Sequence, residues 1–78
     1  MKKGDWYFID GDRVLLITEM LDNNVVNTIR LRKNFICESK TKREFVEELF
    51  TKAHSVDIKN NRYSFFDENN HYIGEVEI

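Results

Sequence analysis

The sequence predicts an α+β fold in which a single amphipathic helix packs on antiparallel strands. One segment, 42–54, has apolar residues at helical spacing, whereas short apolar or alternating segments, three before it and three after it, are typical of strands. The chain has no proline, so Asn, Asp and Gly must form its turns. We therefore expect two antiparallel three-stranded meanders, one on each side of the helix. They form one bent sheet or a small open barrel with the helix packed on it.

The first meander is expected to contain strands at residues 6–9, 14–17 and 25–33. Residues 14–17 are apolar at every position, as in a central strand that is buried on both faces. An Asp-Gly-Asp turn at 10–12 and an Asp-Asn-Asn turn at 22–24 connect these strands. Tight turns between consecutive strands predict antiparallel pairing.

The segment 25–33 alternates more clearly than any other. One face carries Val25, Ile29 and Leu31, and the other carries Val26, Thr28, Arg30 and Arg32. The next segment, 35–37, is expected to extend the sheet briefly or to tuck under it. We expect its Cys37 to be a small buried apolar residue, because no catalytic signature surrounds it.

The helix is expected to begin with a capping box. Thr41 and Glu44 have the spacing at which a hydroxyl and a carboxylate cap the first turn reciprocally. The apolar stripe that follows consists of Phe45, Val46, Leu49, Phe50 and Ala53. Polar side chains lie opposite, so the stripe is expected to be buried on the sheet.

The second meander is expected to contain strands at residues 56–58, 63–66 and 72–78. Turns at Asn60-Asn61 and at residues 67–70 separate these strands. In the last strand, Tyr72, Gly74, Val76 and Ile78 are expected to share one face.

Length and composition indicate one soluble domain, 1–78. The chain has 78 residues, of which 41% are apolar and 33% charged, and this balance argues against disorder. A single cysteine excludes an intramolecular disulfide and favours a reducing, cytoplasmic location. No segment approaches the roughly 20 apolar residues of a membrane span, so no membrane partner is expected.

The sequence predicts no enzyme, metal site or cofactor. His54 and His71 are far apart, whereas a zinc site needs Cys or His pairs at short spacing. The three glycines are isolated, so no glycine-rich loop can hold a phosphate. A calcium loop starting at Asp67 would need Gly at its sixth position and Glu at its twelfth, where this chain has Tyr72 and Ile78.

Charge is concentrated in the middle of the chain. The net charge is −2, yet residues 29–43 contain six basic side chains and one acidic one. The basic residues are Arg30, Arg32, Lys33, Lys40, Lys42 and Arg43. They could track a phosphate backbone, so a nucleic-acid-binding domain is one hypothesis. The acidic remainder of the chain argues against it.

The leading hypothesis from the sequence is a small non-catalytic binding module that acts on a protein partner as a regulator or inhibitor. The aromatic residues outnumber what one small core can hold, and Trp6, Tyr7 and Phe66 are the interface candidates. A sheet with one helix leaves one face to be polar, closed into a barrel or buried against a second copy, which allows a homodimer. The high content of Asn, Lys, Ile and Phe, the short length and the lack of catalytic motifs are typical of small accessory proteins of phages, other mobile elements or low-GC bacteria.

Overall fold

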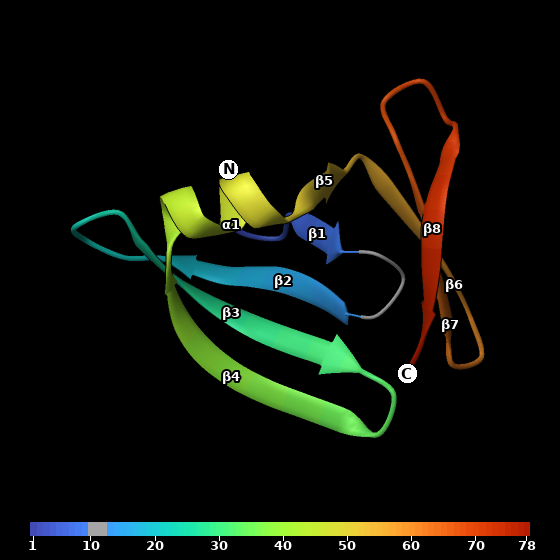
Figure 1. The fold of residues 1–78 in the computed structure, drawn as a ribbon, viewed down its shortest axis with the longest axis horizontal. Helices are drawn as coiled ribbons and strands as arrows, with labels where there is room; N and C mark the ends of the chain where they lie inside the picture. Colours follow the sequence, from blue (N-terminus) through green and yellow to red (C-terminus); the bar gives the residue numbers. More distant parts are fainter. Residues whose placement is uncertain (10–12) are drawn as a thin grey trace.

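The fold consists of two antiparallel sheets and one short helix. The computed structural model describes residues 1–9 and 13–78 (Figure 1). The larger sheet has the order β4-β3-β2-β1-β5 and contains β1 (Trp6–Ile9), β2 (Arg13–Met20), β3 (Val25–Arg32), β4 (Phe35–Lys42) and β5 (Thr51–Ala53). The smaller sheet contains β6 (Ser55–Lys59), β7 (Arg62–Phe66) and β8 (Tyr72–Glu77) in that order, and helix α1 (Arg43–Leu49) follows β4. No helix in the described ranges is long and apolar enough to cross a membrane.

Antiparallel sheets with one short helix confirm the predicted character of the fold, but the arrangement of the strands differs from the prediction. The sheets have five and three strands and are separate, whereas we expected two three-stranded meanders in one bent sheet or barrel. The difference has two causes. The segment expected at 35–37 is an eight-residue strand, β4, and β5 returns to pair with β1. The expected turn at residues 10–12 lies outside the described residues.

The helix is shorter than the predicted 42–54, and the predicted capping box is wrong. Lys42 is the N-cap residue and makes no side-chain cap hydrogen bond. Thr41 belongs to β4, opposite Val26, and its Oγ1 is buried without a partner. The backbone becomes extended at Phe50, after which β5 hydrogen-bonds to the edge of β1. Pairing with an existing strand therefore overrides the helical spacing of residues 50–53.

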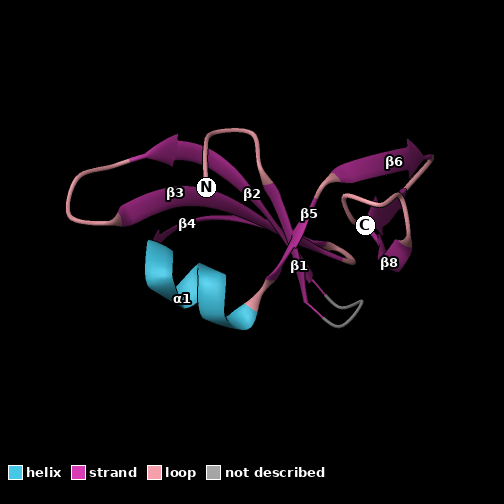
Figure 2. Ribbon diagram, turned by 90° about the horizontal axis from the view of Figure 1, so that it is seen from above, coloured by secondary structure: helices cyan, strands magenta, loops and turns pink. Residues whose placement is uncertain are grey.

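Different partners cover part of each face of the five-stranded sheet. One face forms a helix-side core with α1, made of Tyr7, Leu15, Ile17, Val26 and Val46. The opposite face forms a sheet-side core with the smaller sheet, made of Phe8, Val14, Leu31, Ala53, Phe65 and Val76. Helix α1 and the smaller sheet lie at opposite ends of the molecule (Figure 2). The prediction that residues 14–17 form a central strand is confirmed, because β2 supplies both cores.

The apolar stripe of the helix is only partly buried. Val46 is fully buried, but Phe45 and Leu49 are 47% and 49% exposed. A seven-residue helix presents too few positions to cover the sheet with all of its apolar side chains.

A bulge changes the expected face of Tyr72. Tyr72 pairs with Phe66 and Gly74 pairs with Phe65, so the ladder shifts at Ile73. Gly74 and Val76 face the sheet-side core, whereas Tyr72 is 56% exposed. The strict alternation predicted for residues 72–78 therefore fails at its first position.

Candidate functional site

Three arginines converge on one face of the larger sheet, and we call Arg13, Arg30 and Arg32 the arginine cluster. In the register of β2 and β3, Leu15 lies opposite Arg30 and Val14 opposite Leu31. The ladder therefore brings Arg13, at the start of β2, beside Arg32. Side chains at alternate positions share a face, so the cluster lies on the same face as Leu15 and the helix-side core.

The arginine cluster surrounds a small cavity beyond the part of the sheet that α1 covers. The cavity has a volume of about 160 Å³ and is lined by the cluster, Leu31 and Phe35. Phe35 lies opposite Arg32 in the β3–β4 hairpin, and the Arg32 guanidinium carbon is 4.9 Å from the centre of its ring. The site thus combines several fixed positive charges with an aromatic ring that is 43% exposed.

Arg30 and Arg32 are not neutralised by carboxylates of the described residues. No ion pair within 4.0 Å involves either guanidinium in this part of the chain. The Nε of Arg30 is also buried without a hydrogen-bond partner. A buried donor on a charged group is costly when it is unpaired.

The six basic residues singled out in the sequence do not form one surface. Arg30 and Arg32 belong to the arginine cluster. Lys40 and Lys42 pair with Asn27 and Val25 of β3 and point to the opposite face of the sheet. Lys33 lies at the hairpin tip with its Nζ 3.9 Å from Glu77 Oε1, and Arg43 Nε donates to Glu47 Oε1 at 2.8 Å. The sequence prediction therefore identified two residues of the cluster and missed Arg13.

The three predicted protein-interface residues are also separated. Trp6 is partly buried between the sheets, with its ring 5.8 Å from that of Tyr63 and 6.2 Å from that of Phe65. Tyr7 is only 4% exposed in the helix-side core, so it offers almost no surface to a partner. Phe66 is partly buried, and its ring meets that of Tyr72 edge-on at 6.1 Å.

Burial also changes the chemistry of Tyr7. Burial, and then the carboxylates of Asp5 and Glu47, raise the pKa of its phenol. The phenol stays neutral near pH 7, as a core position requires.

Cys37 lies on β4 and is partly exposed, which contradicts the prediction of a buried apolar residue. Its Sγ donates to Glu38 O at 3.2 Å. The outer position of β4 in the sheet explains the exposure, because no described strand covers that edge.

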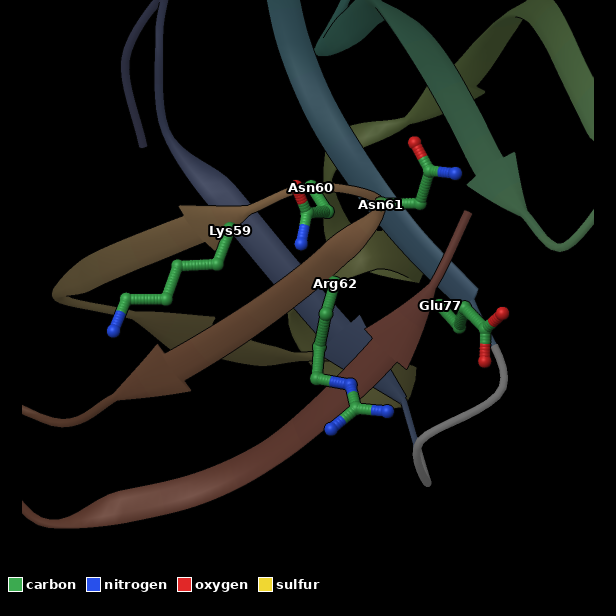
Figure 3. A pocket seen from close by; sticks show the side chains of 5 residues that line it. All are labelled: Lys59, Asn60, Asn61, Arg62 and Glu77. Carbon is green, nitrogen blue, oxygen red and sulfur yellow. The ribbon is translucent and has the colours of Figure 1, made fainter.

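A larger surface hollow carries few groups that could bind a ligand. Its volume is about 440 Å³, and it lies at the β6–β7 hairpin beside β8 (Figure 3). The lining residues are Lys59, Asn60, Asn61, Arg62 and Glu77. The guanidinium of Arg62 is already paired with Glu75 at 3.0 Å, and the Lys59 side chain extends away from Asn61 (Figure 3). This arrangement leaves Lys59 as its one basic side chain without an ion pair among the described residues, whereas Arg30 and Arg32 both lack one.

A second hollow of about 290 Å³ lies beside the β7–β8 turn and is lined by Lys52, His54, Asp67 and Glu68. Asp67 Oδ1 accepts hydrogen bonds from the backbone N–H groups of His71 at 2.8 Å and Asn69 at 2.9 Å. The bond from His71 is the main cause that lowers the pKa of Asp67, and the bond from Asn69 adds to it. This carboxylate therefore organises the turn. Among the residues described, no group of three or more His, Cys, Asp or Glu side chains could hold a metal ion.

Acidification is expected to weaken the β7–β8 turn. Because the folded-state pKa of Asp67 is depressed, its carboxylate stabilises the fold above its unfolded-state pKa, about 3.9. That contribution is lost as the pH falls through the folded-state pKa. Urea unfolding between pH 6 and about pH 2 should show a smaller acid-induced loss of stability in Asp67→Asn than in the wild type. Glu68→Gln is the control, since Glu68 has no hydrogen bond or ion pair among the described residues; equal losses in all three proteins would contradict the prediction.

Comparison with protein-family models, curated proteins and solved structures finds no match to this chain.

Proposed function

We propose that the protein is a non-catalytic module that binds single-stranded nucleic acid through the arginine cluster. The observation that carries the proposal is the convergence of Arg13, Arg30 and Arg32 around one cavity, with an exposed aromatic ring beside them. Guanidinium groups bind phosphate oxygens through two parallel hydrogen bonds, and this geometry suits a phosphodiester.

The aromatic neighbour favours a single strand over a duplex. Phe35 is 43% exposed and is already in contact with the Arg32 guanidinium, so an unpaired base could stack on it next to a bound phosphate. A duplex presents its charge over a longer surface. Here Lys40 and Lys42 point to the other face, and the net charge of −2 opposes broad electrostatic attraction. A short stretch of single strand fits the size of the cluster.

Neutralising the cluster should remove this binding. Arg30→Gln with Arg32→Gln is expected to weaken binding of a fluorescent oligothymidylate or oligouridylate at low salt by more than about tenfold, because each charge-assisted hydrogen bond contributes about 1.5–3 kcal/mol. Fluorescence anisotropy measures the affinity. The slope of log K against log salt should also fall by about 0.7 per lost phosphate contact.

The matched control is Lys59→Gln with Arg62→Gln, which removes the same charge from the hollow in Figure 3. We expect this control to bind within about twofold of the wild type. Arg32→Glu, at an exposed position, tests the site without disturbing the partly buried Arg30. Absence of binding by the wild type at low salt, or equal loss in both double variants, would refute the proposal.

Protein recognition, as a regulator or inhibitor, is a second candidate function, and the apolar surface of α1 favours it. Phe45 and Leu49 are about half exposed and lie four residues apart, on one side of the helix. Affinity capture with the wild type and with Phe45→Ser plus Leu49→Ser tests this alternative. If the protein recognises a partner through α1, mass spectrometry should identify a protein that is captured by the wild type and lost with the double variant.

A further inference from the structure

The outer edge of the larger sheet carries a strand of eight residues, β4. No described strand pairs with its outer side. Such an edge presents unpaired N–H and C=O groups, which can form hydrogen bonds with another strand.

The alternation of the ladder shows which main-chain groups point outward. Arg43 N–H donates to Asn24 O at 2.7 Å, immediately beyond the last paired residues of β3 and β4. Opposed residues in an antiparallel ladder alternate between hydrogen-bonded and non-hydrogen-bonded pairs. Phe35, Cys37, Ser39 and Thr41 therefore direct their main-chain groups toward β3. The outward-facing residues are Ile36, Glu38, Lys40 and Lys42.

We propose that a second copy of this chain pairs through this edge, β4 against β4, in an antiparallel homodimer with a two-fold axis at Ser39. In this register all four outward-facing residues form hydrogen-bonded pairs with the partner strand. Glu38 lies opposite Lys40 of the second copy, and the symmetry repeats this pair. Opposite charges directly across a strand pair are stabilising.

The neighbouring registers are less favourable for the same reasons. Hydrogen bonding requires outward-facing residues to pair with one another, and these residues occur at every second position. The register can therefore shift only by two residues at a time, which moves the two-fold axis by one residue. An axis at Glu38 places two carboxylates opposite each other, and an axis at Lys40 places two ammonium groups opposite each other. Like charges across a strand pair are destabilising. Of these three registers, only the one with its axis at Ser39 places no like charges opposite each other.

The same register covers an exposed apolar side chain. Ile36 is 70% exposed and lies opposite Lys42 of the second copy. The aliphatic part of a lysine side chain can cover an apolar neighbour while its ammonium group remains in water. Because the axis is perpendicular to the sheet, both helices lie on one face of the combined sheet.

Single cysteines test the register directly. At the axis, the two Ser39 residues form a non-hydrogen-bonded pair with Cα atoms about 4.5 Å apart, within the range of a disulfide. In a Cys37→Ser background, Ser39→Cys is expected to form an interchain disulfide under mild oxidation, seen on a non-reducing gel. Glu38→Cys and Lys40→Cys in that background are the controls and should form much less, because each would lie opposite the other position.

A charge exchange tests the proposal without cysteine chemistry. Light scattering over a concentration series should show that Glu38→Lys weakens dimerisation by more than about tenfold, and that adding Lys40→Glu restores it. Circular dichroism checks that every variant is folded. A wild type that stays monomeric at millimolar concentration would overturn the proposal, as would a disulfide that forms faster from Glu38→Cys or Lys40→Cys. Pairing of the edge with an extended peptide of another protein in place of a second copy would also overturn it. The test does not depend on nucleic-acid binding.

Discussion

Phe65→Ala is expected to unfold most of the protein at room temperature. Phe65 is fully buried, with its ring centre 5.5 Å from that of Phe8 and 6.2 Å from that of Trp6. It therefore connects β7 of the smaller sheet to β1 of the larger one. Truncation of a buried Phe costs about 3–5 kcal/mol, and a domain of this size has a total stability of about the same magnitude.

Circular dichroism and urea unfolding measure the effect of Phe65→Ala. Phe35→Ala is the matched control, because it removes the same atoms from a ring that is 43% exposed. We expect the control to lose less than about 1 kcal/mol. A loss of similar size in both variants would show that the two sheets are not held together through Phe65.

Gly74→Ala, which adds one methyl group, is expected to cause the second large loss of stability. A Cβ at this position would overlap the Cζ of Phe8 and lie 2.6 Å from its Cε1. Phe8 is 7% exposed in the sheet-side core, so its ring has little room to move. Overpacking of this kind costs about 1–3 kcal/mol, which for a domain of this size lowers Tm by roughly 4–8 °C for each kcal/mol.

A double-mutant cycle separates this overlap from other effects of the substitution. Phe8→Leu shortens the side chain that the new methyl group meets. Thermal unfolding should show that Gly74→Ala costs at least about 1 kcal/mol less in the Phe8→Leu background than in the wild type. Additive losses would mean that contact with the Phe8 ring is not the cause.

The turns and the central strand could be predicted from local chemistry. In the absence of proline, the predicted turns at 22–24, 60–61 and 67–70 contain Asn23, Asn24, Asn60 and Asn70 with positive φ between 55° and 63°. Asparagine tolerates this left-handed region better than most residues do. The run of apolar residues at 14–17 likewise indicated burial on two faces. Both signals are local, so no knowledge of distant contacts was needed.

The extent of β4 and the pairing of β5 could not be predicted in the same way. Residues 38–42 are polar, because they lie at a sheet edge where little burial is required. Residues 51–53 continue a helical spacing, but hydrogen bonds to β1 are available to them in the folded chain. Both outcomes depend on which strand edges remain open after the first four strands have paired.

A single bulge explains why only two of the three residues in the arginine cluster could be predicted. Alternation placed Arg30 and Arg32 on one face, and the structure confirms this placement. The register of β2 against β3 shifts by one residue between Ile17 and Glu19. Without this shift Arg13 would lie opposite Lys33, away from Arg32. No feature of the sequence around Thr18 predicts the bulge. The position of Arg13 beside Arg32 therefore could not be predicted.

Two consecutive residues of β1 supply different cores. Tyr7 is 4% exposed in the helix-side core, and Phe8 is 7% exposed in the sheet-side core. The strand is hydrogen-bonded to β2 on one side and β5 on the other. Solvent can therefore reach its amide groups only after a flanking strand has separated. Amide hydrogens of β1 that bond to the central strand β2 should therefore exchange through larger opening motions than those that bond to the short edge strand β5.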